Sequence, residues 1–117
     1  MLITLMKSKI HRATITDADL NYVGSISIDE NLMKAADLRE YEKVQIANIS
    51  NGERLETYVI KAPAGSGTIA LNGAAARKGS KNDLIIIIAY GHFEKAEADN
   101  FKPKVVHVDQ SNKQISL

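Results

Sequence analysis

The sequence predicts an all-β fold, a small closed β-barrel with a few short helices. Stretches of alternating or β-branched residues recur at short intervals along the chain. Turn-forming residues separate these stretches, and an Asn-Gly pair at 51–52 lies between two of them. The helical patterns last only one or two turns. Short strands must therefore supply most of the structure.

The first third of the chain is expected to be extended on both sides of a turn. "IHRATIT" (10–16) is rich in β-branched residues and predicts a strand, and "DADLNY" (17–22) begins with turn formers and should reverse the chain. "GSISI" (24–28) alternates and should be extended again. The Gly-Ser pair at 24–25 therefore lies outside any tight turn. The pairs at 65–66 and 79–80 fall in a loop and at the end of a helical turn.

A short helix is expected over 30–37. Asp29 is a favourable N-cap, and the residues expected to be buried on one helix face are Leu32, Met33 and Ala36.

A hairpin should follow. The strand over 43–50 places Val44, Ile46 and Asn48 on one side, and a second strand runs over 53–62. The intervening Asn-Gly predicts a type I′ turn, in which both central residues have positive φ.

The second half repeats the same kinds of element. In order, we expect a loop over 63–67, a strand over 68–73, a helical turn over 74–79 closed by Gly79, a strand over 83–93 buried on both faces, a short helix over 94–100 and a last strand over 102–109. The polar tail after Asp109 is expected to be weakly ordered.

Length and composition narrow the function classes. A chain of 117 residues predicts a single domain over 1–117, and its aliphatic core, poor in aromatic residues, is of a kind often helped by oligomerisation. A formal charge of +1 argues against nucleic acid as a partner. The longest apolar run is too short to span a bilayer, and the N-terminus lacks the pattern of a secretory signal, which predicts a cytoplasmic protein without a membrane partner. With no cysteine and three scattered histidines, no metal site is expected.

The pair Gly24-Ser25 offers a specific chemistry. Glycine leaves its carbonyl open to attack, and the next residue supplies a hydroxyl that can attack it. Such an N→O acyl shift converts the peptide bond into an ester. β-Elimination and hydrolysis then leave a pyruvoyl group at position 25 and release ammonia. The plain alternative is a glycine at a bulge followed by a surface serine.

The surroundings of this pair resemble a known family, the pyruvoyl-dependent aspartate 1-decarboxylases. The resemblance runs from "MLITLMKSKIHRATIT" to "FKPKVVHVD" and is carried by "KSKIHRATIT", "ADLNYVGSISID", "NGERLETYVI" and "LNGAAAR". It implies a double-psi β-barrel that assembles as a homotetramer with sites at subunit interfaces. It also implies decarboxylation of L-aspartate to β-alanine for pantothenate synthesis.

The resemblance implies self-cleavage between Gly24 and Ser25, giving a β chain (1–24) and an α chain (25–117). The pyruvoyl group made from Ser25 is then the covalent cofactor, which forms a Schiff base with aspartate and accepts electrons as CO₂ leaves. No metal is implied. The sequence identifies no maturation factor.

Further residues match positions of the family's site. The resemblance implies that Arg54 and Lys9 bind the substrate carboxylates, and that Tyr58 is the catalytic proton donor. Thr57 is implied to bind substrate and to assist cleavage. In a regular strand, however, residues 57 and 58 point to opposite faces. Both can serve one site only if the strand is irregular there or if a neighbouring subunit shares the site.

The motif after the hairpin adds a second group of implied contacts. Asn72 would offer a side-chain hydrogen bond, and the backbone N–H groups of Gly73, Ala74 and Ala75 would receive a carboxylate. His11 is implied in processing, and Tyr22 lies near the site.

Taken singly, each of these residues also has a plain structural explanation. Two alternative functions stay open: a non-enzymatic β-barrel that serves in binding or assembly, and a self-cleaving decarboxylase of another small amino acid.

Overall fold

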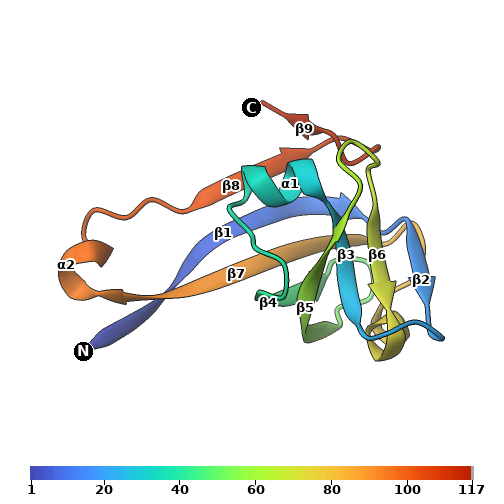
Figure 1. The fold of residues 1–117 in the computed structure, drawn as a ribbon, viewed down its shortest axis with the longest axis horizontal. Coiled ribbons are helices and arrows are strands. Elements are labelled where there is room, and N and C mark those ends of the chain that lie inside the picture. Colours follow the sequence, from blue (N-terminus) through green and yellow to red (C-terminus); the bar gives the residue numbers. More distant parts are fainter. Residues whose placement is uncertain (117) are drawn as a thin grey trace.

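The computed structural model describes residues 1–116, and strands dominate it (Figure 1). The elements in chain order are β1 (Leu2–Thr14), β2 (Asp17–Asp19), β3 (Ser25–Asp29), α1 (Glu30–Ala35), β4 (Lys43–Asn48), β5 (Arg54–Ala62), β6 (Ile69–Asn72), the 3₁₀ helix η1 (Gly73–Lys78), β7 (Leu84–Glu94), α2 (Lys95–Ala98), β8 (Lys104–Val108) and β9 (Gln114–Ile115). The prediction of an all-β fold with a few short helices is confirmed.

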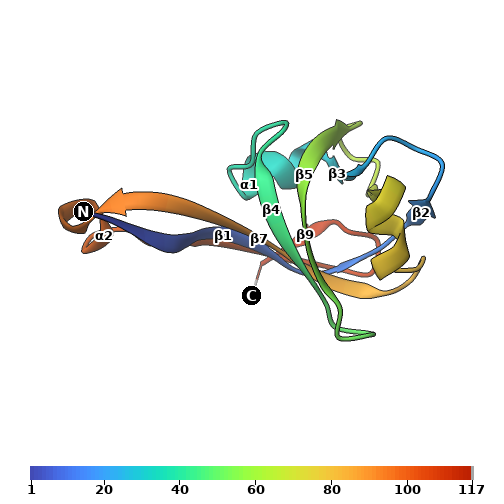
Figure 2. The same ribbon diagram turned by 90° about the horizontal axis from the view of Figure 1, so that it is seen from below.

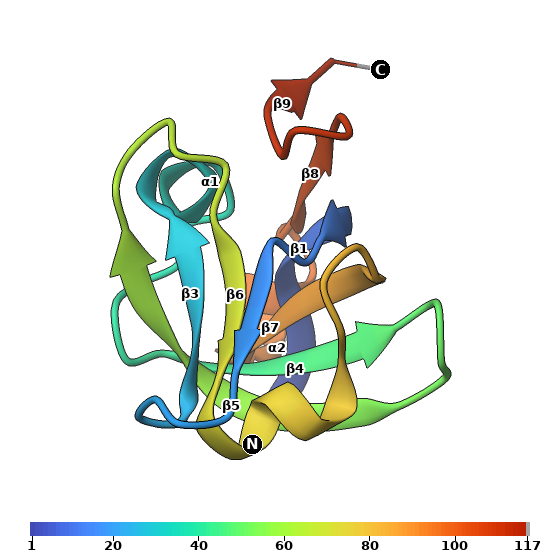
Figure 3. The same cartoon turned by 90° about the vertical axis from the view of Figure 1, so that its right-hand side faces the viewer.

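The strands form one sheet in the order β2-β6-β3-β5-β4-β7-β1-β8-β9. The pairs β1–β8, β2–β6 and β3–β5 are parallel, and the others are antiparallel. The sheet curls around an aliphatic core, as the end-on view shows (Figure 3). Beyond the barrel, β1 and β7 continue as a two-stranded ribbon with α2 at its far end (Figure 2). Ser25 begins β3, which is the third strand in the sheet order. β1 is the seventh and lies toward the other end of the order.

The hairpin of β4 and β5 is confirmed, but its type I′ turn is wrong. Val44, Ile46 and Asn48 are buried as the alternation predicts. Of the Asn-Gly pair, only Gly52 has positive φ, at 77°. The Asn51 side chain accepts a hydrogen bond from the Glu53 N–H at 2.8 Å, and this Asx turn replaces the mirror-image turn. The bond from the Asn48 N–H to the Glu53 carbonyl closes a wider loop.

The N-terminal strand and the following turn also differ from the prediction. β1 begins at Leu2 rather than at residue 10. Within the expected turn over 17–22, Asp17–Asp19 form the short strand β2, which pairs in parallel with β6. That pairing partner lies some fifty residues away, which local turn signals cannot reveal.

The α1 prediction is confirmed. The Asp29 side chain accepts a hydrogen bond from the Asn31 N–H, and Leu32, Met33 and Ala36 are buried. Asp29 is itself buried and accepts two further N–H bonds, from Gly65 and Gly67, at 3.0 and 2.8 Å. These bonds bring the 63–67 loop against the end of β3.

Two expectations for the C-terminal half are wrong. β7 buries Ile85, Ile87 and Ala89 on one face, whereas Ile86 and Ile88 on its other face stay partly exposed. The tail is ordered by contacts with the sheet: β9 pairs with β8, and Asn112 is buried with hydrogen bonds to Thr14 and Gly67. The expectation for the tail also covers residue 117, which lies outside the described residues.

Candidate active site

Ser25 is buried at the start of β3, with its side chain held by Asn72. The two residues lie directly opposite each other in the antiparallel pairing of β3 and β6, and Ser25 is 1% exposed. Asn72 Nδ2 donates to Ser25 Oγ at 2.8 Å and to Ser27 Oγ at 2.9 Å. The Ser25 hydroxyl in turn donates to the Val23 carbonyl at 3.5 Å. A hydroxyl next to a glycine carbonyl is therefore fixed in place rather than free in solvent.

Gly24 and Gly73 lie against each other, with no room for a side chain on the second glycine. A Cβ on Gly73 would lie 2.7 Å from Gly24 Cα and 2.9 Å from the Tyr22 carbonyl oxygen. Gly73 also has φ of +65°, which only glycine adopts readily. The start of η1 therefore fixes the backbone on the N-terminal side of Ser25.

A groove of about 410 Å³ opens beside this backbone. Its lining residues are Gly24, Leu55, Glu56, Thr57, Tyr58, Ala74, Ala75 and Lys78. The groove follows the edge of β5 that β3 leaves free, because β3 pairs with β5 only from Val59 onward. It thus combines the Gly24 backbone with small side chains of η1.

The candidate cations lie elsewhere, on the outer face of the sheet. Ala47 of β4 is paired with Arg54 on one side and Ile86 on the other, so these side chains share a face. Lys9 is paired with Ile88 in the next row of that face. Neither Lys9 nor Arg54 lines the groove. We call this surface of β5, β4, β7 and β1, with Lys9, His11 and Arg54, the cationic face.

His11 lines a different groove, of about 690 Å³, together with His107. The two rings meet edge to face at 5.6 Å. Burial lowers the pKa of His11, and the nearby charges of Lys9, His107 and Arg12 lower it further. His11 Nδ1 is buried and has no hydrogen-bond partner within residues 1–116. The single chain does not bring His11 to Ser25.

Thr57 and Tyr58 belong to a regular ladder. Thr57 is paired with Val44 and Tyr58 with Lys43, without a register shift between Arg54 and Tyr58. The two side chains therefore point to opposite faces, Thr57 inward and Tyr58 outward with Arg54. Both border the groove because it opens at the strand's free edge. The irregular strand that could have united them is absent from this part of the chain.

The other predicted residues lie at the groove or at its margin. Ala74 and Ala75 line the groove, and Asn72 and Gly73 adjoin it through Ser25 and Gly24. Tyr22 contributes its backbone, and its side chain is exposed.

Two neighbours of the site were missed in the sequence. Ser27 shares the Asn72 amide with Ser25, and the i, i+2 spacing of the two serines in a strand could have indicated this. Lys78 enters the groove from the last turn of η1, and no sequence signal pointed to it.

Residues 1–116 give no support for a metal site or for a membrane-spanning helix. No group of three or more His, Cys, Asp or Glu side chains is placed to hold a metal ion. None of the helices in this part of the chain has the length and apolar character needed to cross a membrane.

Comparison with known proteins gives a consistent result along the chain. The family model described as aspartate decarboxylase matches residues 1–115. An aspartate 1-decarboxylase of Acetivibrio thermocellus is 64% identical over 117 residues, which cover 100% of this chain and 93% of that protein. The protein of the same name from Caldicellulosiruptor bescii is 62% identical, with 100% and 91% covered. The one from Aliarcobacter butzleri is 61% identical over 96% of this chain and 88% of its own length. A match of this extent shows descent from a common ancestor, and the chain belongs to the aspartate decarboxylase family.

Proposed function

We propose that this chain is a single domain that cleaves itself between Gly24 and Ser25 and then decarboxylates L-aspartate to β-alanine. The observation that carries the proposal is the buried Ser25 hydroxyl, held by Asn72 beside a glycine that packs against Gly73. Membership of the aspartate decarboxylase family supports the substrate. We also propose that the protein works in the cytoplasm and that its β-alanine supplies pantothenate synthesis.

The cleavage needs only groups of the chain itself and one water molecule. Ser25 Oγ attacks the Gly24 carbonyl carbon, and the peptide nitrogen leaves it and becomes the free amine of Ser25. β-Elimination removes the Ser25 Cα proton and releases the Gly24 carboxylate, which leaves a Cα=Cβ enamine. Its imine tautomer is hydrolysed by one water to the ketone, and the nitrogen departs as ammonia. Asn72 positions the hydroxyl, and Thr57 assists by binding the carbonyl oxygen. No oxidant or metal enters this balance.

The residues around Ser25 fit the small group that this chemistry would leave. Ser25 is replaced by a three-carbon unit of similar size, Asn72 Nδ2 stays available to hold an oxygen, and the groove opens at the Gly24 side. The pyruvoyl group, when formed, supplies an electron sink for loss of CO₂. The small side chains of Ala74 and Ala75 leave space for aspartate in the groove, and the backbone N–H groups of Gly73, Ala74 and Ala75 bind its carboxylate.

The remaining residues bind substrate and move a proton. Arg54 and Lys9 bind carboxylates, and Tyr58 donates the proton from its hydroxyl to the substrate carbon. His11, whose buried Nδ1 has no hydrogen-bond partner within residues 1–116, assists processing, and Tyr22 flanks the cleaved bond.

These groups act on one aspartate only if two subunits share the site. Along the sheet order, Lys9 lies four strands from Ser25, and it does not line the groove. The regular β5 ladder likewise turns Arg54 to the outer face, away from the groove that Thr57 and Tyr58 border. We therefore propose a homotetramer in which the cationic face of one subunit covers the groove of the next.

The mass of the purified chain tests the cleavage. Wild-type protein should yield fragments 1–24 and 25–117, with the larger one lighter by one ammonia than plain hydrolysis predicts. Ser25→Ala should stay one chain and form no β-alanine. An uncleaved wild-type chain under all maturation conditions would favour the binding-module alternative. Cleavage without turnover of aspartate would favour a different small amino acid as substrate.

A further inference from the structure

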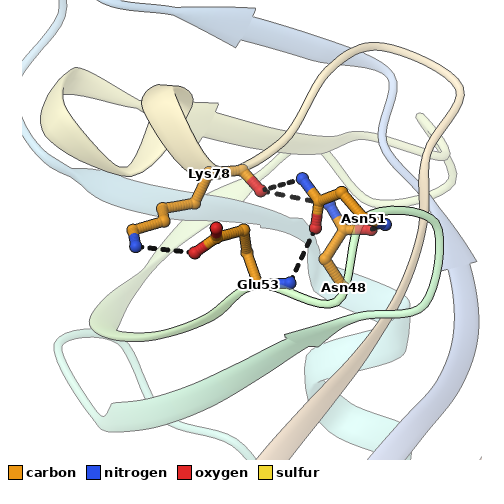
Figure 4. Close-up of polar contacts among 4 residues, drawn as sticks. All are labelled: Asn48, Asn51, Glu53 and Lys78. Atoms are coloured by element: carbon orange, nitrogen blue, oxygen red, sulfur yellow. Dashed lines mark hydrogen bonds and ion pairs between the residues drawn. The ribbon is translucent and has the colours of Figure 1, made fainter.

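The helix η1 forms one wall of the groove and is held at both ends. At its start, Gly73 packs on the backbone of Gly24. At its end, the Lys78 carbonyl accepts hydrogen bonds from Asn48 Nδ2 at 3.1 Å and from Asn51 Nδ2 at 3.0 Å (Figure 4). The Lys78 ammonium pairs with Glu53 at 2.7 Å. The β4–β5 hairpin thus supplies every one of these contacts to the end of η1.

Asn48 is the buried member of this group. Its side chain is 3% exposed, and Nδ2 also donates to the Asp83 carboxylate at 3.0 Å. Its Oδ1 accepts from the Ser50 N–H at 2.8 Å. The partners fix the orientation of the amide, because two acceptors surround the nitrogen and an N–H faces the oxygen.

The chain leaves space for this contact. Gly79 follows η1, and a Cβ there would lie 3.2 Å from Asn48 Nδ2 and closer still to Ile15 and Leu71. The free carbonyl at the end of a helix normally needs a partner. The buried amide of Asn48 reaches the Lys78 carbonyl because Gly79 has no side chain to block the approach.

We infer that Asn48 is a positioning residue for the Gly24-Ser25 site, acting by fixing η1 against the hairpin. The inference rests on the proposed function and deepens it. A 3₁₀ helix rises about 2.0 Å per residue, so the Lys78 carbonyl lies only roughly 10 Å from the Gly73 end. A helix of six residues cannot absorb a shift at one end by bending, so its movement reaches Gly73 and the Gly24 backbone. Asn48 does not contact Ser25 and does not itself line the groove; its one contact with a lining residue is the bond to the Lys78 carbonyl.

The variant Asn48→Asp tests this inference. It keeps an oxygen for the Ser50 N–H but removes the donor to Lys78 and sets a second carboxylate beside Asp83. We expect self-cleavage, followed by intact mass below the melting temperature, to be roughly tenfold slower, since small misplacements of reacting groups cost this much or more. In the cleaved fraction, we expect KM for aspartate to rise more than kcat falls.

Asn112→Asp is the matched control. Asn112 is also buried, with Nδ2 shared between the carbonyls of Thr14 and Gly67 and with Oδ1 accepting the Thr14 N–H. It lies away from the groove, so a similar loss of thermal stability should leave the cleavage rate and KM near wild type. If the two variants slow cleavage in proportion to their losses of stability, Asn48 is merely structural and the inference is wrong.

Asn51→Asp serves where Asn48→Asp does not fold. It keeps the oxygen that accepts the Glu53 N–H and removes only the exposed donor to Lys78. Cleavage should slow about threefold with little change in melting temperature. An unchanged rate would overturn the inference. Failure of the wild-type chain to cleave would instead overturn the proposed function, so the two failures are distinguishable.

Discussion

At the scale of single residues, the contact between Gly73 and Gly24 makes the sharpest demand on side-chain size. Gly73→Ala would add a Cβ 2.7 Å from Gly24 Cα in a residue with φ of +65°. We expect the displaced Gly24 backbone to slow or abolish self-cleavage, measured by intact mass over time. The left-handed conformation alone should cost about 1 kcal/mol of unfolding free energy.

Gly52→Ala separates these two effects. Gly52 has φ of +77°, but nothing lies within 4 Å of the position its Cβ would take. It should therefore show a similar loss of unfolding free energy in denaturant titration and cleave at the wild-type rate. Equal cleavage rates in the two variants would contradict the role given to the Gly24–Gly73 contact.

At the scale of elements, Asp29 links the end of β3, the start of α1 and the 63–67 loop. Burial raises the pKa of this carboxyl, but the N–H bonds from Gly67, Gly65 and Asn31 together lower it below its ordinary value of 3.8. A lowered pKa means that the ionised form favours the folded state. That contribution is complete above the ordinary pKa and is lost as pH falls through the lowered one.

Asp29→Asn should therefore destabilise the protein in a pH-dependent way. At pH 7 we expect a loss of about 1 kcal/mol, measured by urea unfolding, because an amide has only one acceptor oxygen and cannot accept all three N–H bonds. The gap to wild type should shrink as pH falls from 3.8 through the lowered pKa of the folded state, because Asp29 takes up its proton first in the unfolded chain. A gap that stays constant from pH 7 into that range would show that the charge of Asp29 contributes nothing.

Elements also show what the sequence could and could not predict. The alternation of Val44, Ile46 and Asn48 identified a buried strand face because local periodicity reports burial directly. The pairing of β2 with β6 escaped prediction, because a three-residue polar strand gains its partner from a distant segment. The turn type likewise depends on the hydrogen bond from the Glu53 N–H to the Asn51 side chain, which the Asn-Gly pair alone does not predict.

The candidate site, like the fold, was predictable only in part. Its residue types could be named from motifs, but their placement depends on sheet order and on face. Lys9 and His11 lie on β1, whereas Ser25 lies on β3, and only the register shows that one chain keeps them apart. Asn48 and Lys78 gain their roles from contacts between the hairpin and η1, which no local pattern encodes.

At the scale of the whole molecule, the separation of the groove from the cationic face predicts complementation between two inactive chains. Ser25→Ala retains Arg54 but cannot form the reactive group, and Arg54→Ala retains Ser25 but loses the cation. Coexpressed chains should form mixed oligomers in which one subunit supplies what the other lacks. With random mixing, about a quarter of the sites would be complete, and β-alanine formation should recover to that order.

Mixing the two purified variants without subunit exchange is the control for this experiment, and it should stay inactive. Sites built within one chain would give no recovery in the coexpressed sample either. Size measurement of each variant shows whether both assemble.

The position of β1 affects whether the cleaved protein can refold. The proposed cut would leave β1 and β2 on the short fragment, although β1 lies between β7 and β8 inside the sheet and carries the buried Ile10 and Ala13. The two fragments would stay together only through strand pairing and packing. Folding must therefore precede the cut, and after it a denatured molecule would have to find its own N-terminal strand as a separate partner in solution. Maturation would turn a chain able to renature alone into an assembly whose recovery depends on its concentration.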